Sequence, residues 1–214
     1  MFKKIIFSQL ILNWYHKFGR KKLPWKKNKN IYNIWISEIM LQQTKVKTVI
    51  PYYKKFIKKY PNFEKLSKIS LNKILKIWKG LGYYNRAKNI YKTILIIKNK
   101  HNGIFPTNFI DLINLPGIGK TTAGAILSLS LDYSFPILDT NIKRILIRIN
   151  NFKIKKIKEK KLWELIEKLT PIHNTGKFNQ AMMDIGSKIC TFKKPKCINC
   201  PIKKICKTYK NKNI

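Results

Sequence analysis

The sequence predicts an all-α protein. Apolar residues recur at helical spacing in one segment after another, and loops containing glycine, proline or lysine separate these segments. A chain of 214 residues with 44% hydrophobic residues can bury one substantial core or two small ones. We therefore expect helices packed around one or two hydrophobic cores, with no internal repeat.

In the first half of the chain, apolar spacing predicts helices at residues 5–18, 34–44, 46–59, 71–79 and 83–99. Pro51 falls near the start of the third helix, where proline is tolerated. A basic loop containing Leu23-Pro24-Trp25 separates the first two helices. A second loop, at residues 80–86, mixes paired tyrosines with an arginine. This mixture suits stacking on a base and holding phosphate, although a pair of core tyrosines is an equally ordinary explanation.

The centre of the chain holds a tight hairpin, Leu115-Pro116-Gly117-Ile118-Gly119, between a short helix around Asp111 and a buried helix at 122–131. Two glycines around one apolar residue form a turn too tight for a helix interior. The backbone N–H groups of Gly117, Gly119 and Lys120 would point outward and make a donor site for phosphate. Further helices are expected at 139–149, 158–169 and 177–189.

Charge is the strongest compositional signal. Lysine and arginine number 46 against nine acids, which gives a formal net charge of +37. Such a charge predicts a polyanionic partner, with nucleic acid first. Lysine, isoleucine and asparagine dominate everywhere, so codon bias of an AT-rich genome would supply part of the charge. No segment approaches the roughly eighteen apolar residues of a membrane span, and the apolar start has no signal-peptide cleavage site. We expect a cytoplasmic protein without a membrane partner.

The nine acids can be sorted by position. Most have ordinary explanations at helix starts, in a turn, or among lysines on one helix face: Glu64, Asp111, Asp132, Glu159, Glu164 and Glu167. Glu38 is set in an apolar helix, where burial would raise its pKa as a general acid requires, or where a lysine would simply pair with it. Asp139 lies between an apolar run and a basic helix, as a catalytic carboxylate or an ordinary N-cap. We assign no role to Asp184.

All the cysteines lie near the C-terminus, with the spacing C-x6-C-x2-C-x5-C at Cys190, Cys197, Cys200 and Cys206. Disulfides would require an oxidising compartment, so four thiolates within seventeen residues predict one metal centre. Zinc is the general expectation, and a [4Fe–4S] cluster is the alternative. Because only one C-x2-C pair is present, the spacing favours the iron–sulfur cluster. The lysines of this loop would face a DNA backbone.

The hairpin, the acid after it and the cysteine spacing together resemble the endonuclease III superfamily of DNA glycosylases, and within it most closely the adenine DNA glycosylase (MutY) family. The resemblance extends from residue 12 almost to the C-terminus. It is carried by residues 12–15, 23–25, 35–44, 49–52, 80–84, 128–131, 135–139 and 178–184. The combination is far more specific than any one motif.

The resemblance implies two helical lobes with a DNA cleft between them. Residues 24–134 would form a six-helix barrel that carries the helix-hairpin-helix, with its hairpin at 115–119. Residues 1–23 and 135–214 would form a second lobe, discontinuous in sequence, which ends in a [4Fe–4S] cluster loop at 190–206.

The resemblance also implies roles for individual residues. Glu38 would protonate an adenine flipped out of the duplex, Asp139 would stabilise or trap the sugar cation, and Asn141 would assist beside it. Base-pocket and DNA-stack positions are matched by Trp25, Gln43, Tyr83 and Gln180. The phosphate-binding hairpin is matched by Gly117, Gly119, Lys120 and Thr121. The cluster would be held by Cys190, Cys197, Cys200 and Cys206.

Two features separate this chain from parts of the superfamily. Members that also cut the DNA backbone carry a Schiff-base lysine where this chain has Thr121, and Lys120 lies one position too early. The resemblance therefore implies a monofunctional glycosylase that hydrolyses the N-glycosidic bond of adenine opposite 8-oxoguanine or guanine in double-stranded DNA. The chain also stops where full-length relatives continue into a Nudix-like domain, so we expect that domain to be lacking and mispair discrimination to be narrower.

Two alternatives share this fold. One is an endonuclease III-like glycosylase and AP lyase for oxidised pyrimidines, although Thr121 and the match at 128–139 argue against it. The other is a non-catalytic, lesion-binding relic, but drift toward lysine would have removed idle acids such as Glu38 and Asp139. We expect a monomer associated with the bacterial nucleoid.

Overall fold

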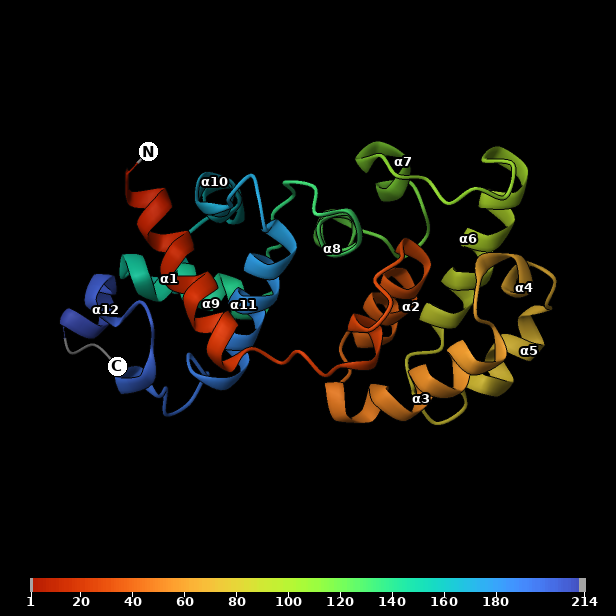
Figure 1. The fold of residues 1–214 in the computed structure, drawn as a ribbon, viewed down its shortest axis with the longest axis horizontal. Helices are drawn as coiled ribbons and strands as arrows, with labels where there is room; N and C mark the ends of the chain where they lie inside the picture. Colours follow the sequence, from red (N-terminus) through yellow and green to blue (C-terminus); the bar gives the residue numbers. More distant parts are fainter. Residues whose placement is uncertain (1, 212–214) are drawn as a thin grey trace. The chain divides into compact units, whose positions relative to one another are not determined.

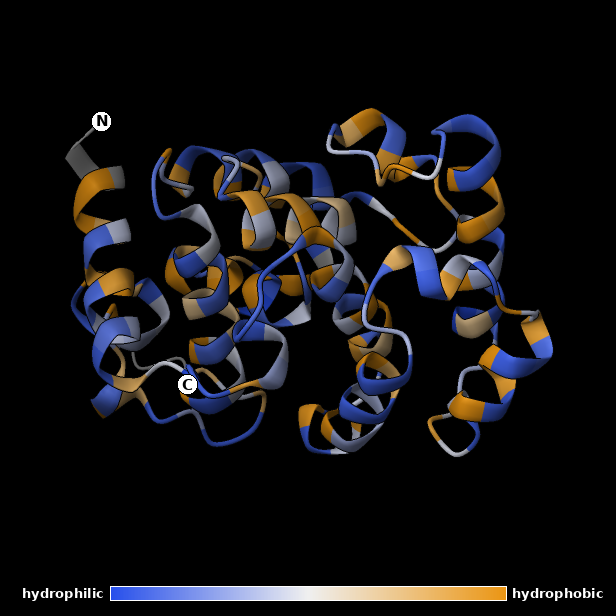
Figure 2. Cartoon of the chain, turned by 45° about the vertical axis from the view of Figure 1, so that its right-hand side comes forward, coloured by the Kyte–Doolittle hydropathy of each residue, from blue (hydrophilic) through white to orange (hydrophobic). Residues whose placement is uncertain are grey.

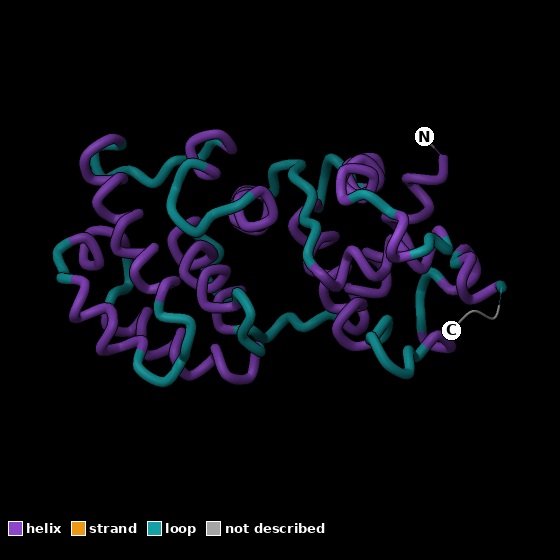
Figure 3. The backbone as a smooth tube through the Cα atoms, turned by 180° about the vertical axis from the view of Figure 1, so that it is seen from behind, coloured by secondary structure: helices purple, strands orange, loops and turns teal. Residues whose placement is uncertain are grey.

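The structure, a computed structural model, describes residues 2–211, without the side chains of residues 2–4 and 155. Within these residues it contains helices and loops but no strand (Figures 1 and 3), and helices make up 66% of the chain. The predicted all-α class is confirmed. The chain divides into two compact units: one contains the chain up to Arg20 and from Asp132 onward, and the other contains Lys21–Leu131.

The unit Lys21–Leu131 is built around a helix that is buried along most of its length. This helix is α2 (Ile31–Leu41), and it packs against α3 (Val46–Lys59) and α8 (Lys120–Leu131). The other elements are η1 (Pro24–Lys26), α4 (Phe63–Ser67), α5 (Leu71–Trp78), α6 (Asn85–Lys100) and α7 (Phe109–Ile113). Large aromatic side chains fill the core, among them Trp35, Phe56 and Trp78, each fully buried.

The boundaries of two helices in this unit differ from the prediction, for local reasons. The helix expected at 34–44 begins at Ile31, because the Asn30 side chain accepts a hydrogen bond from the Asn33 N–H at 2.8 Å and caps the first turn. It ends at Leu41, because Gln43 has a φ of 55°. The helix expected at 83–99 begins at Asn85, because Tyr83 has a φ of 50°. These left-handed values are incompatible with an α-helix.

The other unit is organised around α11 (Thr175–Lys188), which packs against α1 (Phe2–Phe18) and α9 (Thr140–Asn150) (Figure 1). Its remaining elements are η2 (Ile154–Lys156), α10 (Glu159–Leu169), η3 (Cys197–Asn199), η4 (Lys203–Ile205) and α12 (Lys207–Lys210). Apolar and polar residues alternate around these helices (Figure 2), as expected for helices that bury one face.

Two acids connect the residues at the boundaries of this unit to α11 by hydrogen bonds. Asp184, fully buried on α11, accepts hydrogen bonds from the backbone N–H and the Nε of Arg20 at 2.8 and 2.6 Å. Asp132 accepts from the N–H groups of Asn174 and Gly176 at 3.0 and 2.8 Å, at the first turn of the same helix. Asp184, which had no role from sequence, is therefore a structural acid. Among the described residues, no helix has the length and apolar character of a membrane span.

Candidate functional site

Glu38 lies on α2, a largely apolar helix. Its side chain is half-buried, and its neighbours on the helix, from Ile34 to Ser37 and at Ile39 and Met40, are all buried. The predicted insertion of a carboxyl group into an apolar helix is therefore present. Its role as an acid stays a prediction.

The hairpin at residues 115–119 has the geometry that its glycines predict. Gly117 has a φ of 78°, and a Cβ at this position would lie 2.7 Å from the Asn89 Nδ2 atom, so only glycine fits. α8 begins at Lys120, directly after Gly119. Among the described residues, the N–H groups of Gly117 and Gly119 donate to no backbone carbonyl. Two amide donors and a helix N-terminus thus come together at the surface, as an anion site requires.

The end of α2 is tied to this hairpin. The Gln42 Nε2 atom donates to the Gly117 carbonyl at 3.0 Å and to the Thr122 Oγ1 atom at 3.4 Å. The hairpin, the turn after α2 and the start of α8 therefore form one surface of the unit. Thr121 occupies the position at which a lyase would be expected to carry its Schiff-base lysine. It is half-buried in the first turn of α8, whereas Lys120 is exposed.

Gln43 and Tyr83 line one surface pocket, although 40 positions separate them in sequence. Both side chains are exposed, Tyr83 by 58%. Both backbones are left-handed, with φ of 55° and 50°. Such conformations cost about 1–3 kcal/mol each in a residue with a side chain and persist only where the surroundings enforce them.

Arg86, at the start of α6, is largely buried, although it contributes to the lining of the same pocket as Gln43 and Tyr83. Its side chain is only 6% exposed, so the expectation that this arginine holds phosphate is wrong. The guanidinium donates instead to backbone carbonyls at the end of α2 and in the loop before α6. Burial lowers the pKa of Arg86, and the neighbouring Tyr83 acts in the opposite direction; the group stays protonated at neutral pH.

Asp139 is the N-cap of α9. Its Oδ1 atom accepts from the Ile142 N–H at 2.8 Å, and its Oδ2 atom accepts from the Asn141 Nδ2 at 2.9 Å. The N-cap role, which the sequence left open, is therefore real. It also gives the half-buried carboxylate a fixed orientation, which a catalytic role would use.

Asn141 links this carboxylate to the cysteine loop through α9. Its Oδ1 atom accepts from Arg144 Nη2 at 2.8 Å, and Arg144 Nε donates to the Cys190 carbonyl at 2.6 Å. One turn later, Arg148 Nη1 donates to the Cys190 Sγ at 3.4 Å and to the Thr191 carbonyl at 2.7 Å. A Cβ at position 186 would lie 2.5 Å from the Asn141 Cβ, so Gly186 makes room for this chain of contacts.

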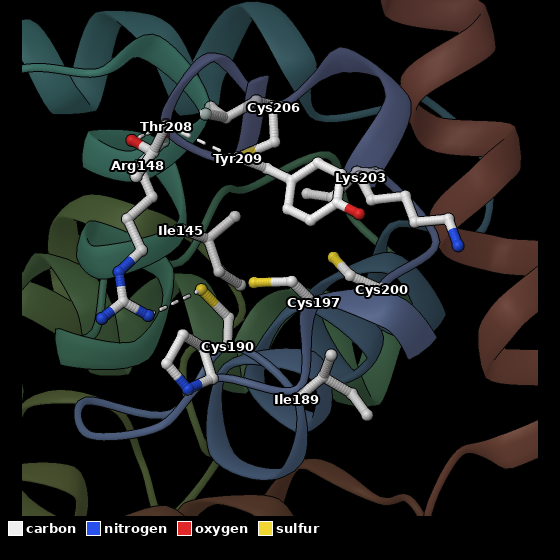
Figure 4. A pocket seen from close by; sticks show the side chains of 13 residues that line it. Ile145, Arg148, Ile189, Cys190, Cys197, Cys200, Lys203, Cys206, Thr208 and Tyr209 are labelled. Carbon is white, nitrogen blue, oxygen red and sulfur yellow. Dashed lines mark hydrogen bonds between the residues drawn. The ribbon is translucent and has the colours of Figure 1, made fainter. Parts of the chain in front are cut away.

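The four cysteines line one pocket, together with apolar side chains of α9 and the ring of Tyr209. Figure 4 shows the side chains of Cys190, Cys197 and Cys200 directed toward one another. Within the described residues, no three His, Cys, Asp or Glu side chains meet at a position that a single metal ion could occupy. Burial raises the pKa of the Cys200 thiol to about 11 and also raises the pKa of Cys197, with the other thiols adding to both shifts. A set of soft sulfur donors in a largely apolar pocket fits an iron–sulfur cluster.

Two predicted base-pocket residues are less informative. Trp25 is 1% exposed and packs edge-on against Tyr53, with ring centroids 5.4 Å apart. Gln180 is half-buried on α11. Contact of either residue with a base stays a prediction.

Sequence reasoning missed the structural roles of the arginines. The chain has only four, Arg20, Arg86, Arg144 and Arg148, among 46 cationic residues. All four guanidinium groups are hydrogen-bonded to a buried acid or to backbone carbonyls. Their rarity in a lysine-rich chain was the available signal, because lysine cannot replace the planar fork of donors.

Comparison with known proteins gives a consistent result. Residues 36–169 match the family described as "HhH-GPD superfamily base excision DNA repair protein". The chain is 64% identical over 207 residues to the adenine DNA glycosylase of Buchnera aphidicola subsp. Acyrthosiphon pisum. The aligned region covers 95% of this chain and 59% of that protein. Adenine DNA glycosylase of Mus musculus is 34% identical over 95% of this chain and 42% of its own length. The chain thus spans 59–61% of the length of the three Buchnera relatives that it matches.

Solved structures show the same fold. A thermostable thymine-DNA glycosylase superposes with a TM-score of 0.89 at 32% identity, covering 98% of this chain and 97% of that one. An endonuclease III in non-covalent complex with DNA superposes with a TM-score of 0.81 at 21% identity, over 96% of this chain and 94% of that one.

Proposed function

The chain belongs to the HhH-GPD superfamily of base excision DNA repair proteins, and from this premise we propose that it is a DNA glycosylase that hydrolyses the N-glycosidic bond of adenine. The observation that carries the choice of adenine is its similarity, at 59–64% identity over nearly its whole length, to adenine DNA glycosylases. The two candidate carboxyl groups supply the chemistry.

Cleavage of a glycosidic bond passes through a state in which the sugar carries positive charge and the departing base needs a proton. We assign proton donation to Glu38, because it is a half-buried carboxyl group on the largely apolar helix α2. We assign stabilisation of the sugar cation to Asp139, whose two oxygens are held by the Ile142 N–H and by Asn141. Asn141 would then act by orienting Asp139.

DNA binding in this proposal begins with the hairpin. The N–H groups of Gly117 and Gly119 would hold one phosphate, with Lys120 and Thr121 at the N-terminus of α8 behind them. Gln43 and Tyr83, exposed at one pocket, would enter the base stack beside the flipped adenine. The net charge of +37 supports tight, salt-sensitive binding to the duplex.

The cysteine pocket would hold a [4Fe–4S] cluster through Cys190, Cys197, Cys200 and Cys206. The lining supports this assignment, because all four thiols and no acid surround one pocket. When bound, the cluster would supply structural cross-linking of the loop. Arg144 and Arg148 hold the loop against α9 from the protein side.

We further propose that the unit Lys21–Leu131 corresponds to the barrel lobe of the family and that the other unit corresponds to the cluster lobe. The protein would act as a monomer on nucleoid DNA. Its substrate adenine would lie opposite 8-oxoguanine or guanine. A second candidate substrate is thymine in DNA. It is favoured by the TM-score of 0.89 and the 32% identity to a thymine-DNA glycosylase of matching length.

A panel of duplexes tests the proposal. The purified protein is incubated with duplexes containing adenine opposite guanine, adenine opposite 8-oxoguanine, thymine opposite guanine, or an oxidised pyrimidine. Strand breaks are measured with and without hot alkali. We expect breaks at adenine only, and only after alkali, since Thr121 stands where a Schiff-base lysine would. Breaks without alkali, or a covalent complex trapped by borohydride, would contradict the monofunctional assignment, and breaks at thymine would favour the second candidate.

A further inference from the structure

Arg86 makes an unusual set of contacts for a buried arginine. Its Nη1 atom donates to the carbonyls of Met40 at 2.5 Å and Gln42 at 2.7 Å, and its Nη2 atom donates to the Gly82 carbonyl at 2.9 Å. Weaker contacts at 3.3–3.4 Å reach the carbonyls of Ile39, Leu81 and Tyr83. All these acceptors are backbone carbonyls. One guanidinium therefore joins the C-terminal end of α2 to the loop before α6.

Two of these acceptors occupy special places in the chain. The Gln42 carbonyl belongs to the peptide group directly before Gln43, and the Gly82 carbonyl belongs to the peptide group directly before Tyr83. Among the residues that line their shared surface pocket, Gln43 and Tyr83 have left-handed backbones. Such conformations persist where neighbouring contacts enforce them. Arg86 supplies an enforcing contact to both.

The same guanidinium also touches the Tyr83 side chain. Its central carbon lies 5.2 Å from the centroid of the Tyr83 ring and 5.5 Å from that of the Trp78 ring. A cation near an aromatic ring is attracted to its face. The orientation of the exposed Tyr83 ring is therefore coupled to the group that fixes its backbone.

We propose that Arg86 is a positioning residue that holds Gln43 and Tyr83 at one fixed spacing, so that both side chains enter the DNA base stack as a unit. This inference rests on the proposed function, in which these two residues contact the stack. We assign Arg86 itself no contact with DNA, because it is only 6% exposed and its guanidinium is bonded to backbone carbonyls. Lysine cannot substitute for it, since a single ammonium lacks the fork of donors that reaches both loops.

The test is a double-mutant cycle with two readouts. Arg86→Lys is made in the wild-type chain and in a Gln43→Ala/Tyr83→Ala background. The first readout is unstacking, measured from the fluorescence of 2-aminopurine placed beside the mispaired adenine. The second is the single-turnover rate of adenine release. In the wild-type chain we expect Arg86→Lys to lower both by about ten- to a hundredfold, because small misplacements of positioned groups have effects of this size.

In the background that lacks both side chains, the same substitution should change either readout by less than about twofold, since coupled residues are non-additive. An equal loss in both backgrounds would show that Arg86 only supports folding, and would overturn the inference. Arg20→Lys is the matched control, because it also replaces a hydrogen-bonded guanidinium. Arg20 binds Asp184 and belongs to the other unit of the chain. It should lower thermal stability while leaving the unstacking signal near the wild-type value.

Failure of the proposed function and failure of the Arg86→Lys variant to fold can each be distinguished from failure of this inference. If the wild-type protein unstacks the reporter but releases no adenine, the proposed function fails, and the cycle can still be scored on fluorescence. If Arg86→Lys does not fold, amide hydrogen exchange of the wild-type protein decides. We expect the amides of residues 41–44 and 81–84 to open together, because one group ties both segments. Opening of the two segments with clearly different protection would overturn the inference.

Discussion

The two units use arginine in different ways to support their candidate site residues. In Lys21–Leu131, Arg86 binds backbone carbonyls and holds two exposed residues in left-handed conformations. In the other unit, Arg144 binds the Asn141 side chain, which in turn binds Asp139, a residue with the ordinary extended backbone of an N-cap. The first arrangement enforces strain, and the second orients an unstrained carboxylate.

This difference indicates where each site is vulnerable. The Gln43 and Tyr83 surface depends on contacts within one compact core, because every partner of Arg86 lies between Ile39 and Tyr83. The Asp139 site depends on the cysteine loop, because Arg144 donates a hydrogen bond to the Cys190 carbonyl and Arg148 donates one to the Thr191 carbonyl. Substitutions can therefore be chosen to affect one site, the other, or the chemistry alone.

The largest effect should come from removing the chemistry while leaving both arginine networks intact. Glu38→Gln should lower single-turnover adenine release by about 10²–10⁴-fold, the usual range for a general acid. Asp139→Asn should lower it by about 10²–10³-fold, as for lost charge stabilisation, while its side-chain oxygen still caps α9. Filter binding should show nearly unchanged DNA affinity, because phosphate contacts dominate it. Full activity in both variants would remove the catalytic assignment.

The next effect should fall on the unit that contains α9. Cys197→Ser should lower bound iron and sulfide and the yield of folded protein, because the loop that anchors Arg144 and Arg148 loses its cross-link. Hydrogen exchange should report weaker protection of α9 and α11, with α2 and α8 unchanged. Phe192→Ser is the control, since Phe192 is in the same loop but 75% exposed. A colourless wild-type protein holding one zinc per chain would contradict the cluster.

The smallest effect should come from the hairpin. Gly117→Ala forces a side chain into a φ of 78° and against Asn89, and should lower the free energy of unfolding by about 1–3 kcal/mol. It should also weaken DNA binding, because the hairpin amides would move. Gly119→Ala is the matched control, because a Cβ there meets nothing within 4 Å. Equal thermal stability of the two variants would show that the hairpin geometry is less constrained than described.

Much of this molecule could be predicted from the sequence, where the signal is local. The helical class, the glycine hairpin and the alternative role of Asp139 as an N-cap all follow from neighbouring residues. The four cysteines of the predicted cluster loop line one pocket, and the cluster itself stays a prediction. The left-handed Gln43 and Tyr83 could not be predicted, because in our proposal their conformation depends on Arg86, which joins the loop beside it to the Gln42 carbonyl 44 positions away. The lysine-rich composition also concealed the four arginines, since their charge is shared by most of the surface.

The central claim is that adenine is hydrolysed from duplex DNA. It is tested most directly by identifying the released base with mass spectrometry after single-turnover incubation with a duplex containing adenine opposite 8-oxoguanine. We predict free adenine in a one-to-one ratio with abasic sites, and none from the Asp139→Asn variant. Release of thymine from a mispair with guanine instead, or no base from any duplex, would contradict the account.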